Sequence, residues 1–293
     1  MNGTRDSLSP SRSGVSAAAR VASFSLAIAV LSLGTIAATS GTPAPDPASV
    51  AAPVPAFIAT PTPSQQTPAE IIDQVDRLMR GKSSHGTATM EIVTEHWSRS
   101  LTMEVWSLGT DYSLVRVSSP AKEAGTATLK AHRDIWNYLP KVDRTVKIPA
   151  SMMSGAWMGS HFTNDDLIKD RRLVDDYEID IAFDGERDGE TVWEFTLTPM
   201  PEAPVVWGYI EYVVRQNDLM PLSARFFDED GGLSRTMEFT DFTDMGGRLV
   251  PALMTMFPAD KPGETTSMRY SDLEFDVDID EGFFSLQTLR RRR

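Results

Sequence analysis

After Gly81, apolar and polar side chains alternate along most of the chain with a period of two. Met90 and Ile92 stand between polar neighbours, and Leu101 and Met103 repeat the pattern. Such alternation is typical of β-strands that have one apolar face. Further strand-like runs cover residues 112–117, 124–131, 134–139, 143–148, 175–183, 190–198, 204–216, 220–228, 233–243, 248–257 and 264–275.

Short turns separate these runs, among them Asp230-Gly231-Gly232 and Pro262-Gly263. Short connections favour antiparallel pairing, because parallel neighbours need a long crossover. A meander of more than ten antiparallel strands must curl or close. The pattern therefore predicts a mainly β, α+β domain built on one curved sheet.

One helix precedes the strands. Thr67, Pro68 and Glu70 form a capping box with proline at the first helical position. The apolar positions from Ile71 onward follow helical spacing, and Gly81 is suited to end the helix.

Two of the strand-like runs are apolar on both faces, which predicts that both faces are covered. These are residues 204–214 and 250–257. The cover is either a filled core or the wall of a cavity for an apolar ligand. The candidate cavity residues are Trp207, Tyr209, Ile210, Met254 and Met256.

The alternation stops between residues 149 and 170. Methionine and aromatic side chains stand there among glycine, serine and alanine, and Thr163 is suited to cap a short helix. The segment is either a loop packed on the core or a lid or contact surface. Its candidate contact residues are Met152, Met153, Trp157, Met158 and Phe162.

The N-terminus has the features of an export signal. Arginines precede the apolar stretch 21–38, and small residues follow it. We expect a signal peptide over residues 1–40, with an uncleaved membrane anchor as the alternative. Residues 41–66 are rich in proline and alanine and predict a disordered linker, so the folded domain is expected over 67–293.

The composition and the missing motifs argue against several classes of function. The net charge of −13 argues against nucleic-acid binding, and the absence of cysteine excludes disulfides and thiolate metal sites. The sequence contains no HExxH, GxSxG, P-loop or GxGxxG motif. We therefore expect no metal, no cofactor and no enzymatic activity.

One basic stretch stands out in this acidic chain. It is either an ordinary exposed hairpin or a patch for an anionic head group or an acidic partner. Its residues are Lys130, Arg133, Lys141, Arg144 and Lys147.

Residues 125–167, GTATLKAHRDIWNYLPKVDRTVKIPASMMSGAWMGSHFTNDDL, resemble the signature of bacterial outer-membrane lipoprotein-sorting proteins, which are LolA-like. The helix opening at Thr67 and the closing Phe283-Phe284-Ser285-Leu286 fit the same family. The resemblance implies a LolA/LolB-like fold, which is a curved, unclosed antiparallel β-barrel of about eleven strands with covering helices.

The resemblance also implies a function. It points to a monomeric periplasmic carrier that binds lipid or lipoprotein acyl chains and passes them towards the outer membrane. An inner-membrane transporter and an outer-membrane acceptor are the implied partners. The alternative is a lipid-sensing or transporter-docking adaptor with the same fold and no net lipid carriage.

Overall fold

The computed structural model describes residues 66–164, 166, 173–203 and 205–291. The expected signal peptide, nearly all of the expected linker and most of the helix expected after Thr163 lie outside these residues. Among the residues described, no helix is both long enough and apolar enough to cross a membrane.

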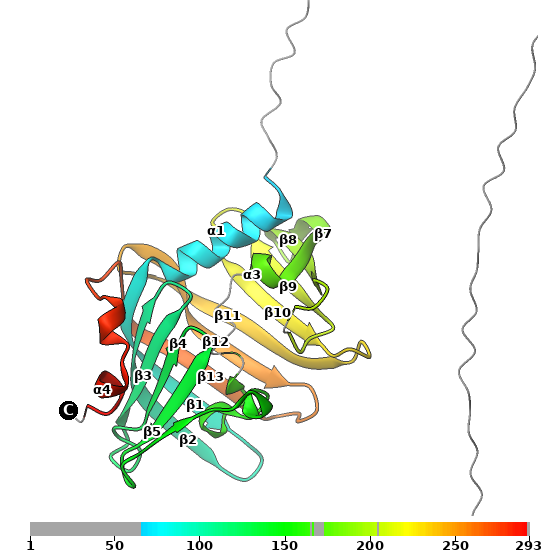
Figure 1. Ribbon diagram of the computed structural model, residues 1–293. Coiled ribbons are helices and arrows are strands. Elements are labelled where there is room, and N and C mark those ends of the chain that lie inside the picture. Colours follow the sequence, from blue (N-terminus) through cyan, green and yellow to red (C-terminus); the bar gives the residue numbers. More distant parts are fainter. Residues whose placement is uncertain (1–65, 165, 167–172, 204, 292–293) are drawn as a thin grey trace, which may run out of the picture. The chain divides into compact units, whose positions relative to one another are not determined.

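Within the described part of the chain, thirteen strands form one antiparallel sheet. Figure 1 shows their arrangement. The first six strands are β1 (Ser83–Val93), β2 (Ser98–Leu108), β3 (Tyr112–Ser119), β4 (Ala127–Ala131), β5 (Asp134–Leu139) and β6 (Arg144–Lys147). The other seven are β7 (Tyr177–Arg187), β8 (Glu190–Pro199), β9 (Tyr209–Arg215), β10 (Pro221–Phe227), β11 (Leu233–Met245), β12 (Arg248–Pro258) and β13 (Thr265–Phe275).

Strands that follow each other in the sequence pair in the sheet, except β6 and β7, and the first strand also pairs with the last. β1 pairs with β13 along its length, whereas β6 and β7 form the two free edges. The sheet therefore curls without closing (Figure 1), which confirms the predicted fold class. It has more strands than the approximately eleven implied by the resemblance, because every strand-like run of the sequence forms a strand of its own.

Helix α1 (Pro68–Arg80) begins at Thr67 with the predicted capping box, and Gly81 follows its last turn. Ile71, Ile72 and Val75 are buried against β7–β10 in one hydrophobic cluster. Figure 1 shows α1 lying across one end of the curled sheet. The remaining short helices are η1 (Ala150–Met152), η2 (Trp157–Gly159), α3 (Leu173–Asp176), η3 (Glu281–Phe283) and α4 (Leu286–Leu289).

Strands β2–β4 are covered on both faces of the sheet. On the inner face, Met103 and Val115 belong to a cluster with side chains of β1 and β13. On the outer face, Trp106 and Leu114 pack against Phe284 from the C-terminal segment. The C-terminal segment with η3 and α4 thus seals the outside and leaves the inner face to form a site.

The strand expected over 204–216 begins later than predicted. β9 starts at Tyr209, because Gly208 lies against the backbone of the neighbouring segment. A Cβ atom at Gly208 would come within 2.2 Å of the carbonyl oxygen of Asp228. The alternation therefore cannot be extended from β9 back to Trp207.

Candidate functional site

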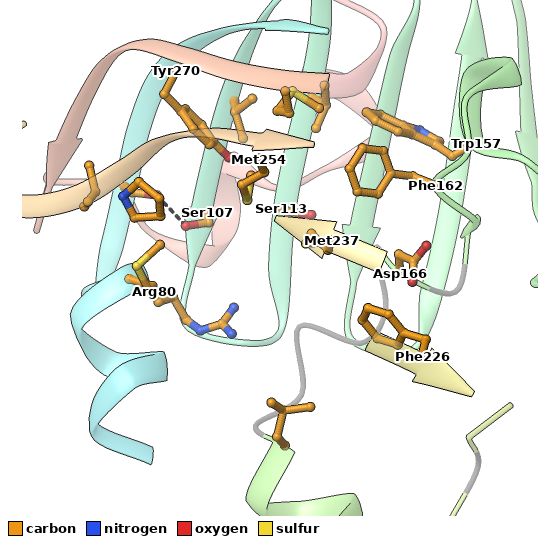
Figure 2. A pocket seen from close by; sticks show the side chains of 18 of the residues that line it. Arg80, Ser107, Ser113, Trp157, Phe162, Asp166, Phe226, Met237, Met254 and Tyr270 are labelled. Atoms are coloured by element: carbon orange, nitrogen blue, oxygen red, sulfur yellow. Dashed lines mark hydrogen bonds between the residues drawn. The ribbon is translucent and has the colours of Figure 1, made fainter. Parts of the chain in front are cut away.

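A cavity of about 450 Å³ lies between the inner face of the sheet and α1. This volume falls within the range of small-molecule sites, about 300–1,000 Å³. Figure 2 shows Trp157, Phe162 and Asp166 gathered on one side of it and Arg80 on another.

Most of the cavity wall is apolar. Five methionines contribute to it, Met79, Met103, Met237, Met254 and Met268. Their unbranched side chains adapt to ligands of different shape. The charged residues in the wall are Arg80, Asp166, Asp176 and Arg235. The arrangement suits a ligand with a long apolar part and few polar groups.

The structure brings three of the five cavity candidates together, since Trp207, Ile210 and Met254 line the cavity. Tyr209 does not line it and stacks on Phe227, with ring centroids 4.2 Å apart. Because β9 starts only at Tyr209, Trp207 and Tyr209 do not share one strand face, and only Trp207 reaches the cavity.

Met256 is fully buried and also lies outside the cavity lining. It shares the inner face of β12 with Met254, but its register partners are Met237 and Thr266. Thr266 is hydrogen-bonded to His161 of the segment that follows β6. Met256 therefore belongs to the packed region beside that segment.

Residues 149–164 form a segment that we call the strap. It leaves the edge strand β6 and precedes the other edge strand, β7, so it belongs to the connection across the opening of the sheet. The chain turns sharply at Met158 and Gly159, which have φ angles of 51° and 73°. An isolated bridge between Ala156 and Thr163 then closes the turn.

Trp157 anchors the strap on β1–β4. Its side chain is 2% exposed and packs among Met90, Met103 and Val115. Its Nε1–H donates to Oγ1 of Thr128 on β4, at 3.1 Å. The indole thus combines apolar burial with a satisfied polar group.

His161 anchors the strap on β13. Its Nε2 lies 3.0 Å from a carboxylate oxygen of Glu264, and its Nδ1 lies 2.8 Å from Oγ1 of Thr266. Because a carboxylate only accepts, Nε2–H is the donor to Glu264, while Nδ1 and the Thr266 hydroxyl share the second hydrogen bond. The backbone amide of His161 also donates to Thr266, which is fully buried. This chain of hydrogen bonds holds the strap in place.

Asp166 forms the third anchor, just beyond the strap. Nη1 and Nη2 of Arg235 on β11 donate to its two oxygens, at 2.8 and 2.6 Å. The amide and hydroxyl of Thr163 donate to the same carboxylate. The connection between β6 and β7 is therefore tied to β4 on one side of the sheet and to β13 and β11 on the other.

The pKa of Asp166 lies below the ordinary value of an aspartate. Burial alone raises the pKa of this carboxyl, but the hydrogen bonds and charge of Arg235 and the hydrogen bonds from Thr163 lower it by more. Asp166 is therefore ionised at neutral pH and forms a true ion pair with Arg235.

We expect the stabilising effect of Asp166 to be lost in acid. Because its folded pKa lies below the unfolded value of about 3.9, its contribution is complete at neutral pH. That contribution falls as the pH drops from about 4 through the folded pKa. The measurement is the difference in Tm between wild type and Asp166→Asn, which should shrink below about pH 4. A difference that grows in acid would contradict this assignment.

The predicted contact residues of the strap divide into two groups. Trp157 and Phe162 line the cavity, and Met158 packs against the cluster around Trp157. Met152 is 54% exposed and Met153 is partly buried, and neither lines the cavity. The Met152 carbonyl accepts from Gly155 and Asn164, so its backbone shapes the loop while its side chain faces solvent.

One residue of the basic stretch, Lys130, does not belong to an exposed patch. Lys130 is buried and donates to the Thr110 carbonyl at 2.7 Å, because an ammonium on a covered strand needs an acceptor. Lys147 pairs with Asp134 at 2.7 Å. The exposed residues of the stretch are Arg133, Lys141, Arg144 and Lys147, on the loops and strands around β5 and β6.

Sequence reasoning missed Arg235 and Asp166. They are 69 residues apart, and each stands in a run that reads as an ordinary strand or helix start. One signal could have indicated Arg235. Once β10 is paired with β11, this arginine lies beside Phe226, an arrangement that suggests a cation held against an aromatic ring. Within the described residues, no group of three or more histidine, aspartate or glutamate side chains is placed to hold a metal ion.

Solved structures with this fold are known from several bacteria. A DUF1329 family protein from Desulfovibrio piger is 22% identical, with a TM-score of 0.69, over 75% of this chain and 97% of that chain. A domain from Vibrio parahaemolyticus named for outer membrane lipoprotein sorting is 24% identical, with a TM-score of 0.66, over 76% and 98%. A LolA superfamily protein from Nitrosomonas europaea is 23% identical, with a TM-score of 0.66, over 76% and 100%.

These likenesses show that the domain has the LolA-like fold, so the resemblance read from residues 125–167 is confirmed at the level of the fold. Residues 109–291 match the model of a family described as "Uncharacterized protein", and the chain belongs to that family. No curated protein matches the chain.

Proposed function

We propose that this protein is a periplasmic carrier that binds lipid or the acyl chains of lipoproteins and transfers them towards the outer membrane. The observation that carries the proposal is the apolar cavity of about 450 Å³ on the inner face of the sheet. The LolA-like fold and the likeness to a domain named for lipoprotein sorting support it.

The physical task of such a carrier is to shield acyl chains from water. Burial stabilises each methylene group by about 0.8 kcal/mol, so a long chain cannot cross an aqueous compartment unaided. An adaptable, methionine-rich wall accepts chains of different length and curvature. No bond needs to be made or broken, and the proposed cavity residues act by contact alone.

The proposal also concerns location and partners. The arginine-flanked apolar stretch at 21–38 supports export through the inner membrane. An inner-membrane transporter as donor and an outer-membrane acceptor complete the proposed route. Release requires an acceptor site that binds the chain as well or better.

Filling the cavity is expected to weaken acyl binding. Ser113 on β3 lines the cavity and is a small residue, so Ser113→Trp places an indole in the space meant for the chain. We expect affinity for a fluorescent acyl probe to fall about tenfold or more, because burial of several methylene groups is lost. The measurement is a fluorescence titration of the delipidated, purified chain.

Ser100→Trp is the matched control, since Ser100 is exposed on the neighbouring strand β2. It makes the same chemical change outside the cavity and should leave probe affinity unchanged. Tm values of both variants show whether the fold is kept. Equal binding by folded Ser113→Trp would place the chain elsewhere, and no binding by wild type would favour the transporter-docking adaptor.

A further inference from the structure

Arg235 is a cation held in an otherwise largely apolar wall. It projects from the inner face of β11, lines the cavity and has a side chain that is 7% exposed. Its guanidinium carbon lies 4.5 Å from the ring centroids of both Trp207 and Phe226. These two rings fix the plane of the guanidinium independently of its hydrogen-bond partners.

The hydrogen bonds of Arg235 leave one edge of the guanidinium without a partner. Two of its five N–H groups meet the carboxylate of Asp166, through Nη1 and Nη2. Nε is buried and has no hydrogen-bond partner among the described residues. Since a buried donor is almost always satisfied in a native structure, an unpaired one requires an explanation.

The pair with Asp166 anchors the chain, but the unpaired Nε–H adds nothing to a carrier for purely apolar chains. Taking a charged pair out of water costs more than a well-packed apolar pair at the same place would. The pair also joins two different parts of the molecule, because Asp166 belongs to the connection between β6 and β7 while Arg235 belongs to the sheet. A hydrogen bond from the unpaired Nε–H to a ligand in the cavity would account for an arginine at this position.

We infer that Arg235 binds the anionic head group of an acyl ligand, a carboxylate or a phosphate oxyanion, through its Nε edge. The Nε–H and the adjacent Nη–H form a second fork that matches two oxygens of such a group. The acyl chain then extends into the methionine-rich part of the cavity. This inference rests on the proposed function and names the class of its ligand.

Asp166 has a defined effect in this arrangement. It binds the adjacent Nη1/Nη2 edge of the same guanidinium, so its negative charge repels the incoming oxyanion. Figure 2 shows Asp166 and Phe226 on the same side of the cavity. Removing the charge of Asp166 should therefore strengthen the binding of anionic ligands without affecting neutral ones.

The test compares two ligands that differ only in the head group. Sodium palmitate and methyl palmitate, each below its aggregation limit at pH 8, displace a fluorescent acyl probe from the delipidated full chain. We expect wild type to prefer palmitate about tenfold or more, as one charge-assisted contact predicts. Arg235→Gln should reduce this preference to about onefold, and Arg235→Lys should restore part of it.

Two further variants separate the effect on ligand binding from an effect on folding. Asp166→Asn should raise palmitate affinity severalfold and leave methyl palmitate unchanged. Arg235→Gln combined with Asp166→Asn leaves no buried charge unpaired and should still lack the preference. Tm values and probe affinity show that each variant is folded.

The outcomes separate this inference from the proposed function. Equal binding of palmitate and methyl palmitate by wild type would overturn the head-group assignment while the carrier function stands. Failure of both ligands and of the probe would overturn the carrier function itself. Displacement of the probe by inorganic phosphate at the same concentration would also overturn the inference, because it would show an anion site that needs no acyl chain.

Discussion

Trp157→Ala is expected to lower the free energy of unfolding by about 3–5 kcal/mol, the range for a buried tryptophan. The side chain packs against strands β1, β2 and β3, and its Nε1–H satisfies Thr128. Its removal leaves a void beside the cavity, and a buried hydroxyl loses a partner. Equilibrium unfolding in urea, followed by circular dichroism, measures the change.

Trp97→Ala is the matched control, because Trp97 is 46% exposed next to β2. The same deletion there should change stability by no more than about 0.5 kcal/mol. Trp157→Phe keeps most of the apolar contact and loses the hydrogen bond, which should cost about 1 kcal/mol from that bond. If Trp157→Ala stayed within about 1 kcal/mol of wild type and changed the probe off-rate, the packed-loop interpretation would be wrong, and Trp157 would act on the ligand as part of a lid or of the cavity wall.

The two interpretations of the 149–170 segment differ in what the sequence can show. The sequence does not distinguish Met152 from Trp157, since both are large apolar residues among glycine and serine. The structure exposes the first and buries the second. Without a regular period, no rule assigns the residues of such a segment to an inside or an outside.

The strands were predictable because alternation is a local property. Each run of period two specifies its own inner face, and the turn residues between runs fix antiparallel pairing. The pairing of β1 with β13 is different, since it joins the two ends of the meander. Only the requirement that a long meander must curl or close points to it.

The cavity candidates show where local reasoning fails. Met254 and Ile210 lie on regular strands, and their position on the inner face follows from alternation. Trp207 reaches the cavity from a segment before the strand, which the close approach at Gly208 separates from it. The backbone contact responsible comes from Asp228, a residue of another turn, so no local pattern reveals it.

The ion pair between Arg235 and Asp166 is the part of the site least visible in the sequence. It depends on three placements at once: β11 beside β10, Trp207 against Phe226, and the strap across the opening. Together these put one arginine at the meeting point of sheet, strap and cavity. Disturbing that point should therefore affect both stability and ligand choice.

Asp166→Ala is accordingly expected to lower the free energy of unfolding by about 3–5 kcal/mol. Most of this cost arises because the buried guanidinium of Arg235 loses the carboxylate that neutralises its charge. The smaller part comes from Thr163, whose amide and hydroxyl lose their acceptor. Urea unfolding at pH 7 measures the loss, since Asp166 is ionised there.

A double-mutant cycle separates the pair from the packing around it. Arg235→Met combined with Asp166→Leu replaces the pair by apolar side chains of similar size and should regain most of the stability lost in either single variant. A coupling free energy of more than about 1 kcal/mol is expected, because the two side chains share two short hydrogen bonds. Purely additive losses would show that the strap is held by Trp157 and His161 alone. In that case the charge of Asp166 should also have no influence on the preference for palmitate.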